Sequence, residues 1–288
     1  EIISMDSRQV YAGMDIGTDK VSAEDRARVP HHGLDVIRPD QRYSAGRFAR
    51  DVRRWVDEIE ERGAWPVLAG GTGFFLKAVM DPIFAEPPLD AVRLEALRAY
   101  LAGQPRDRLE AWVRVLDPDR ADVAMARTLE VALLSGIPLS RWHREAPREA
   151  DGLPGVVVVL DLPRAEMDRR IDERVAGMVE RGLVDEVRAL TAAGYGDDDP
   201  GMTGTGYREM TAYLRGERTL EEAMEDIRRS TRRYARRQLT WLRTQLPDSV
   251  IHIDATRPRA EQVGRVLDAL REAGIEAPGP SRRERSTP

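Results

Sequence analysis

The sequence contains no cysteine, few histidines and no long apolar run. The lack of cysteine excludes disulfides, thiolate zinc sites and a cysteine nucleophile. Only four histidines are present, which argues against a histidine-rich metal centre. No stretch reaches the roughly 18 apolar residues that cross a bilayer, and no leading segment resembles a signal peptide. We therefore expect a soluble cytoplasmic protein.

Lysine is also scarce. Of 45 basic residues only Lys20 and Lys77 are lysines, which leaves 43 arginines. The net charge of −5 shows that the whole chain is not a basic nucleic-acid-binding protein. The arginines are unevenly distributed, however, because residues 228–243 contain seven of them and no acid. With 288 residues, 41% of them apolar, the chain can bury a substantial core in one large or two smaller domains.

Apolar runs and glycines predict an α/β fold. Strands are predicted at 2–5, 32–36, 66–69, 155–160 and 250–253, and helices at 44–62, from 74 onward, 164–181, 184–193, 207–214, 220–246 and 259–273. The strand at 66–69 leads through glycines into a helix, which is the βα unit of a parallel sheet. The run GVVVVL at 155–160 is typical of a strand covered on both faces.

The helical pattern between residues 87 and 147 contains no strand signal. We therefore expect a parallel sheet core flanked by helices, in two parts at 1–85 and 151–275, with an inserted helical domain at 86–150. The last residues, 276–288, are expected to form a disordered tail.

Four polar residues follow the first predicted strand: Asp6, Ser7, Arg8 and Gln9. In open α/β sheets, ligands bind at the carboxyl ends of the strands. A carboxylate there can accept a proton, and its polar neighbours can recognise a ligand. A solvated turn is the alternative interpretation.

Two glycine-containing segments are candidates for anion binding. Residues 13–20 form a glycine-punctuated loop that ends in Lys20, and its N–H groups and ammonium could hold an anion. Residues 70–73 (GGTG) open a helix whose N-terminus attracts negative charge, although tight packing explains these glycines equally well. Neither is a P-loop, because the pattern G-x-x-x-x-G-K-[ST] occurs nowhere in the sequence. Arg170 and Arg174, four residues apart, could bind a pyrophosphate, but ordinary surface arginines are the simpler interpretation.

The arginines of 228–243 recur at helical spacing and form one broad stripe: Arg229, Arg232, Arg233, Arg236 and Arg243. Tyr234 and Trp241 fall mostly elsewhere on this helix and are predicted to pack inward. A stripe without acids favours binding to a phosphate backbone. The alternative is a solvated helix in an arginine-rich proteome.

Eight segments occur in the order and spacing seen in tRNA dimethylallyltransferases, also called tRNA isopentenyl-pyrophosphate transferases: MDSRQVYAGMDIGTDK (5–20), PHHGLDV (30–36), YSAGRFARD (43–51), AGGTGFFLKA (69–78), RTLEVALLSGIPLS (127–140), RIDERVAGMVERGLVDEV (170–187), GTGYREM (204–210) and RRYARRQLTWLR (232–243). The chain resembles this family from residue 1 to about 273. The resemblance implies transfer of a dimethylallyl group from dimethylallyl diphosphate to the exocyclic N6 amine of an adenosine. That adenosine lies 3′ of the anticodon in tRNAs reading U-initial codons. A P-loop-kinase-like fold and Mg²⁺ assisting the diphosphate are also implied.

The same resemblance assigns roles to the candidate residues. Asp6 matches the general base, Thr72 a tRNA-contacting threonine in the active site, and Arg174 an arginine that holds the diphosphate. Lys20, from its place in the glycine loop, is a second diphosphate candidate. Residues 197–202 match a tRNA-contacting loop. The residues expected to bind tRNA are Ser7, Arg8, Gln9, Arg93, Arg127, Arg232, Arg233, Arg236 and Arg237.

Two features depart from the family pattern. The family's first strand and P-loop, with its magnesium-binding Ser or Thr, are not found, so we expect an N-terminally truncated chain whose metal ligands are unknown. The segment 119–126 is short, and Ala124 falls near the position of a second arginine. Alternatives therefore stay open: an adenylate isopentenyltransferase-like or other P-loop small-molecule kinase-type enzyme, or an inactive tRNA-binding fragment. We expect a monomer.

Overall fold

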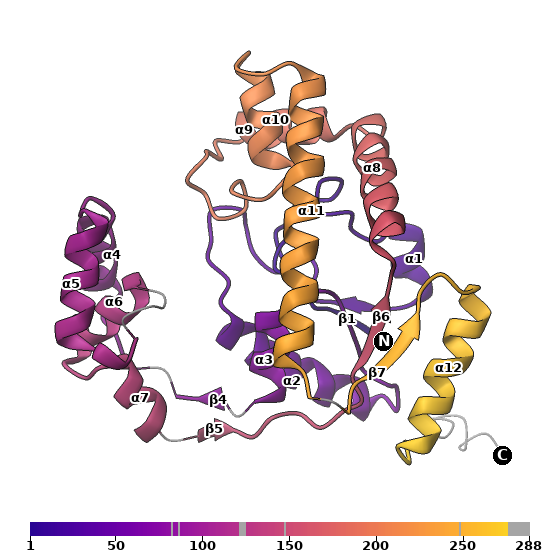
Figure 1. Ribbon diagram of the computed structural model, residues 1–288, viewed down its shortest axis with the longest axis horizontal. Coiled ribbons are helices and arrows are strands. Elements are labelled where there is room, and N and C mark those ends of the chain that lie inside the picture. The colour runs from indigo at the N-terminus through magenta and orange to yellow at the C-terminus, as the bar shows by residue number, and fades with distance from the viewer. Residues whose placement is uncertain (82, 86, 121–124, 147, 248, 276–288) are drawn as a thin grey trace. The chain divides into compact units, whose positions relative to one another are not determined.

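The computed structural model describes residues 1–81, 83–85, 87–120, 125–146, 148–247 and 249–275. The chain divides into two compact units (Figure 1): unit 1 is Glu1–Met80 with Leu153–Pro288, and unit 2 is Asp81–Gly152. The expected insertion at 86–150 falls within unit 2. The position of Ala124 and the expected tail at 276–288 lie outside the described residues.

Unit 1 contains a parallel three-stranded sheet in the order β2-β1-β3. The central strand β1 (Ile2–Ser4) pairs with β2 (His31–His32) and with β3 (Val67–Ala69). The predicted α/β fold with a parallel sheet and flanking helices is confirmed.

Helix α2 (Ala45–Glu61) begins where the sequence predicts, because the Ser44 hydroxyl accepts a hydrogen bond from the Arg47 N–H at 3.1 Å. Its buried side recurs at helical spacing: Phe48, Val52, Trp55 and Ile59. Phe48 stacks at 4.1 Å on Phe75 of α3 (Gly73–Met80), which follows β3. This packing fixes the start of α3 next to the strand ends.

A separate parallel pair is formed by β6 (Val158–Asp161) and β7 (Ile251–Asp254). Among the described strands, β6 pairs with β7 alone. Helix α12 (Arg259–Glu272) packs on β7, and Leu160 is 56% exposed. The prediction that GVVVVL is covered on both faces is therefore wrong, because the strand lies in a two-stranded ladder rather than inside a larger sheet.

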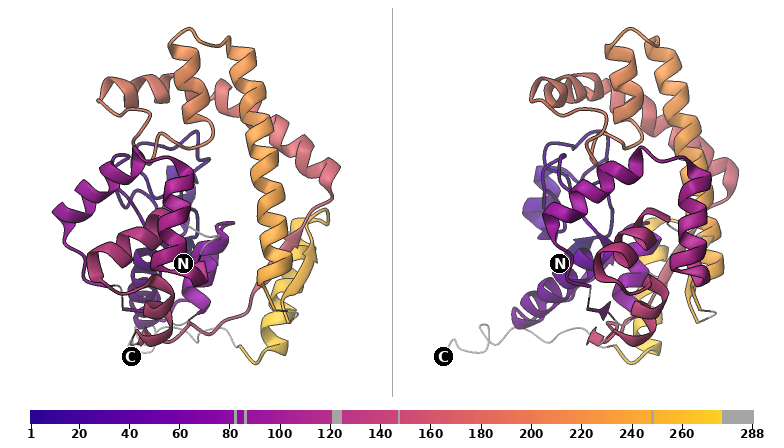
Figure 2. Two further views of the ribbon diagram at one scale, coloured as in Figure 1. Left: turned by 60° about the vertical axis from the view of Figure 1, so that its left-hand side comes forward. Right: turned by 90° about the vertical axis from the view of Figure 1, so that its left-hand side faces the viewer.

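The remaining helices of unit 1 are α1 (Ala23–Arg28), α8 (Arg164–Glu180), α9 (Leu183–Ala192), α10 (Tyr207–Leu214) and α11 (Leu220–Gln245). The long helix α11 packs against α8 and α10 over its first half, and its second half contacts α3 (Figures 1 and 2). Of the helices described, none combines the length and the apolar character that crossing a membrane requires.

Unit 2 is helical around a small apolar core of Leu101, Val113 and Leu129. Its elements are β4 (Ile83–Phe84), α4 (Ala91–Ala102), α5 (Arg106–Leu116), the 3₁₀ turn η1 (Pro118–Arg120), α6 (Met125–Ser135), α7 (Leu139–Glu145) and β5 (Arg148–Ala150). The antiparallel pair β4–β5 is not predicted from the sequence, and both strands lie outside residues 87–147, the range in which no strand is expected. Strands of two and three residues are too short to show a period-2 pattern.

Candidate functional site

The turn after β1 holds the Asp6 carboxylate in a defined orientation. Asp6 Oδ1 accepts hydrogen bonds from the backbone N–H groups of Arg8 at 2.7 Å and Gln9 at 3.4 Å. Among the described residues, Asp6 Oδ2 has no hydrogen-bond partner. One oxygen therefore fixes the side chain, and the other is available to accept a proton.

Thr72 joins the glycine turn at 70–73 to this carboxylate turn. Its Oγ1 accepts a hydrogen bond from the Ser7 N–H at 3.1 Å, and its own N–H donates to the Met5 carbonyl at 3.3 Å. The structure thus brings Asp6, Ser7 and Thr72 together at the carboxyl ends of β1 and β3, as the βα pattern predicts.

Arg8 and Gln9 connect this turn to two other loops. Arg8 Nη1 donates to the Pro200 carbonyl at 2.8 Å, within the loop expected to contact tRNA. Gln9 Nε2 donates to the carbonyls of Thr18 at 3.1 Å and Asp19 at 3.3 Å. Both side chains shape the rim of the site through intramolecular bonds.

The loop 13–20 already binds an anion of the protein itself. Glu186 of α9 accepts hydrogen bonds from the backbone N–H groups of Asp15 at 2.8 Å, Ile16 at 2.7 Å and Gly17 at 3.1 Å. The Tyr207 hydroxyl donates to the same carboxylate at 2.7 Å. Burial raises the pKa of Tyr207, and the charge of Glu186 adds to the rise. The loop therefore binds an anion as its glycines predict, but the anion is the Glu186 carboxylate, which holds the loop against α9.

We expect Glu186→Ala to lower the free energy of unfolding by about 2–4 kcal/mol, because several donors lose a charged acceptor. Chemical denaturation measures the change. Glu180→Ala, on the exposed surface of α8, is the control and should stay within about 0.5 kcal/mol of the parent protein. Equal stabilities for the two variants would contradict the role of Glu186.

The structure corrects the predicted role of Lys20 in binding the diphosphate. Its ammonium donates to the Tyr11 carbonyl at 2.6 Å, to Asp15 at 2.8 Å and to Asp35 at 2.5 Å. The side chain is 1% exposed. All three donors are engaged inside the loop, so Lys20 is not placed to hold a diphosphate.

Arg174 of α8 extends toward the same loop from outside. Its Nε lies 3.2 Å from Asp19 Oδ2, and Arg181 Nη2 lies 2.8 Å from Asp19 Oδ1. The Arg174 side chain is 45% exposed. Arg170, by contrast, bonds to Glu166 at 2.7 Å on its own helix. Arg174 and Arg181 therefore both present a guanidinium that a ligand above the loop 13–20 can reach, whereas Arg170 does not.

The basic stripe on α11 is only partly available to a ligand. Arg232 is 26% exposed, donates to Asp172 of α8, and lies 3.8 Å from Glu225. The predicted contact of Arg232 with a tRNA phosphate is not supported, because neighbouring acids already neutralise the charge of its guanidinium. Among the described residues, four arginines of α11 form no ion pair with an acid: Arg233, Arg236, Arg237 and Arg243.

Tyr234 does not pack inward as predicted, since it is 41% exposed. Partial burial raises the pKa of its phenol, and the nearby Asp6 carboxylate adds to the rise. Its hydroxyl also interacts with Thr72 and Gln238. Helix α11 therefore contributes to the neighbourhood of Asp6, which the sequence pattern did not indicate.

Arg93 and Arg127 belong to unit 2. Arg93 lies in the first turn of α4, where its backbone N–H donates to Asp90 at 2.8 Å. Arg127 Nη1 lies 3.4 Å from Glu130 Oε2, and Arg98 Nε donates to Glu130 at 2.8 Å. Two arginines thus balance one buried carboxylate inside the unit.

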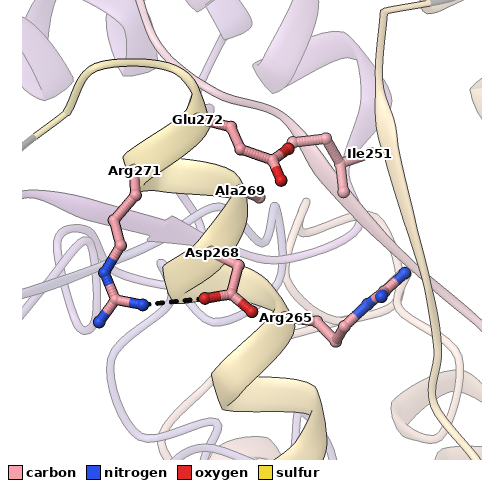
Figure 3. A pocket seen from close by; sticks show the side chains of 6 residues that line it. All are labelled: Ile251, Arg265, Asp268, Ala269, Arg271 and Glu272. Atoms are coloured by element: carbon pink, nitrogen blue, oxygen red, sulfur yellow. Dashed lines mark hydrogen bonds and ion pairs between the residues drawn. The ribbon is translucent and has the colours of Figure 1, made fainter.

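A cavity of about 380 Å³ lies between α12 and β7 (Figure 3). Its lining residues are Ile251, Arg265, Asp268, Ala269, Arg271 and Glu272. Asp268 and Arg271 pair with each other at 2.8 Å. None of the predicted site residues lines this cavity, so it is separate from the Asp6 site.

Comparison with known proteins finds relatives that cover most of the chain. Residues 9–245 match the family described as IPP transferase. A tRNA dimethylallyltransferase of Thermomicrobium roseum is 42% identical over 271 residues, covering 90% of this chain and 79% of that protein. The full-length tRNA isopentenylpyrophosphate transferase of Bacillus halodurans gives a TM-score of 0.67 at 33% identity, covering 96% of this chain and 88% of the other. A eukaryotic dimethylallyltransferase acting on tRNA, 22% identical, has the same fold, with a TM-score of 0.78 over 98% of this chain and 74% of the other. The chain therefore belongs to the IPP transferase family.

Proposed function

We propose that this protein transfers a dimethylallyl group from dimethylallyl diphosphate to the N6 amine of the adenosine 3′ of the anticodon, in tRNAs that read U-initial codons. The observation that carries the proposal is the position of Asp6. Its Oδ2 is open at the strand end, beside a glycine turn that also contacts the arginine-bearing helix α11. The Asp6 turn and the arginine-bearing helix α11 both contact this glycine turn, which supports a shared site for a proton acceptor and for tRNA.

The proposed reaction is a substitution at the allylic carbon of the donor. The N6 nitrogen forms a bond to this carbon as the carbon–oxygen bond to diphosphate breaks. Asp6 Oδ2 accepts the proton that N6 loses, since an aromatic amine is a poor nucleophile without a base. Arg174 stabilises the charge that develops on the departing diphosphate. The adenine leaves its stack to reach the donor.

We propose that Mg²⁺ would assist the diphosphate of the donor, as the family resemblance implies, and we assign no residue of this chain as its ligand. Protein sites for Mg²⁺ commonly provide only one or two carboxylates beside substrate phosphates. In the part of the chain that the structure describes, no group of three or more acidic, histidine or cysteine side chains could hold a metal ion. Neutralising the leaving group is the chemistry that Mg²⁺ supplies when bound.

The position of α11 favours a tRNA acceptor over a mononucleotide, because free AMP does not extend to arginines along a helix. The two alternatives are an adenylate-modifying enzyme and an inactive tRNA-binding fragment, and an acceptor assay distinguishes them. The expected monomeric state and cytoplasmic location stay predictions.

The acceptor assay incubates full-length protein and labelled dimethylallyl diphosphate with unmodified tRNA, with AMP or with buffer. We expect label to enter tRNA alone. Label in AMP would support the adenylate alternative, and tRNA binding without transfer would support an inactive binding protein.

The available arginines of α11 give a separate prediction about binding. Replacing Arg233, Arg236 and Arg237 with glutamine should weaken tRNA binding about equally for all tRNAs, since phosphate contacts do not read bases. The slope of log affinity against log salt should become shallower by roughly 0.7–0.9 per lost contact. Filter binding at several salt concentrations measures both effects.

The control removes the same charge elsewhere, with glutamine at Arg54, Arg188 and Arg271, which pair with acids on their own helices. This variant should keep the parent slope. If both triple variants show the same shallower slope, the arginines of α11 act only through net charge; if both keep the parent slope, they do not contact phosphate. The assignment fails in either case.

A further inference from the structure

Helix α11 holds the glycine turn of the site through two side chains one helical turn apart. Gln238 Nε2 donates to the Gly71 carbonyl at 2.7 Å. An added Cβ at Gly71 would lie 2.3 Å from that nitrogen, and one at Gly73 would lie 2.4 Å from the Trp241 ring. The turn and the helix are therefore in direct contact on both sides of Thr72.

This contact continues toward Asp6 through two hydrogen bonds of Thr72, one to its side-chain hydroxyl and one from its backbone N–H. Thr72, next to Gly71, accepts from the Ser7 N–H at 3.1 Å and donates to the Met5 carbonyl at 3.3 Å. Met5 and Ser7 are the two neighbours of Asp6 in the chain. A displacement of the glycine turn thus changes the backbone on both sides of the carboxylate.

Most glutamine side chains on exposed helices point into water, and Gln238 does not. Its amide nitrogen donates a hydrogen bond to the Gly71 carbonyl of the turn, 167 residues away in sequence. Gln245, on the same helix, donates only to the carbonyl of its neighbour Thr244, at 3.3 Å. The two glutamines therefore form a matched pair, one bound to the site and one outside it.

We propose that Gln238 is a positioning residue, which couples the tRNA-binding helix α11 to the placement of Asp6 through Gly71 and Thr72. The inference rests on the proposed function. In a protein that uses α11 for tRNA, the same helix then sets the geometry of proton acceptance. Binding and chemistry share a structural connection that a small mononucleotide acceptor would not use.

The test compares Gln238→Ala with Gln245→Ala in single-turnover transfer to tRNA at saturating donor. We expect Gln238→Ala to lower the maximal rate roughly 10- to 100-fold, the range typical of a misplaced reacting group. Its tRNA dissociation constant should change by less than about twofold, since no phosphate contact is lost. Gln245→Ala should leave both quantities unchanged, and melting curves check that each variant is folded.

A second variant, Gln238→Glu, preserves the side-chain volume and separates positioning from packing. The carboxylate cannot donate to the Gly71 carbonyl, so Gln238→Glu should lower the maximal rate as Gln238→Ala does. A defect of packing alone would lower the rate of Gln238→Ala and leave Gln238→Glu at the rate of the parent protein.

The outcomes are distinct. Loss of tRNA affinity at an unchanged maximal rate would show that Gln238 is a tRNA contact, and unchanged kinetics would show that it has no role; either result overturns the inference. Absence of transfer by the parent protein would instead overturn the proposed function.

Discussion

Asp6→Asn should reduce dimethylallyl transfer by roughly 10²–10⁴-fold, the usual cost of removing a general base. The substitution is conservative in structure, because asparagine keeps the Oδ1 that accepts from the Arg8 N–H at 2.7 Å. It loses the ability to take up a proton at the second oxygen position. The turn should therefore persist while proton acceptance disappears.

Single-turnover rates with saturating tRNA and donor measure this loss. The tRNA dissociation constant should stay within about twofold, because no phosphate contact is removed. Asp268→Asn, on α12 and paired with Arg271, is the matched control and should retain full activity. Near-parental turnover by the Asp6 variant would rule out this carboxylate as the base.

Arg174→Ala should lower kcat/KM for the donor by roughly 10²–10³-fold, since removing one charged donor from a developing oxyanion has effects of this size. The guanidinium is half-exposed above the loop 13–20 and lies 3.2 Å from Asp19, where a bound diphosphate can replace that carboxylate. Titrating the donor at saturating tRNA measures the effect.

Arg170→Ala is the matched control for this experiment. It lies one turn earlier on the same helix, and its guanidinium is bound to Glu166 at 2.7 Å. We expect its donor saturation curve to resemble that of the parent protein. If Arg174→Ala instead weakens tRNA binding with donor saturation unchanged, its assignment to the diphosphate is wrong.

Local signals in the sequence predict most of the fold. Helix α10 has the predicted bounds, Tyr207–Leu214, because Gly206 adopts a φ of +100° and Glu209 accepts from its N–H at 2.8 Å. The cap at Ser44 likewise fixes the start of α2. The pair β4–β5 is not predicted, because its strands are too short to show a period-2 pattern. The exposure of β6 is not predicted, because it depends on which strands far away in sequence pair with it.

The same distinction applies to the site. Asp6 and Thr72 come together because parallel strands end at one edge, a rule that is local to each βα unit. The glycines of the loop 13–20 predict that it binds an anion, but they do not show which anion. In the structure the anion is the Glu186 carboxylate on a later helix, and not a diphosphate held by Lys20. Arg232 fits the helical period, but Asp172 on α8 neutralises it. Pairing between helices leaves no periodic signal in either one.

The most direct test of the central claim is mass spectrometry of nuclease fragments from unmodified tRNA after reaction with the full-length protein and dimethylallyl diphosphate. We predict one dimethylallyl group on N6 of the adenosine immediately 3′ of the anticodon, in tRNAs reading U-initial codons. The Asp6→Asn variant should leave that adenosine unmodified. A dimethylallyl group on another nucleotide, or equal modification by the Asp6 variant, would contradict the account.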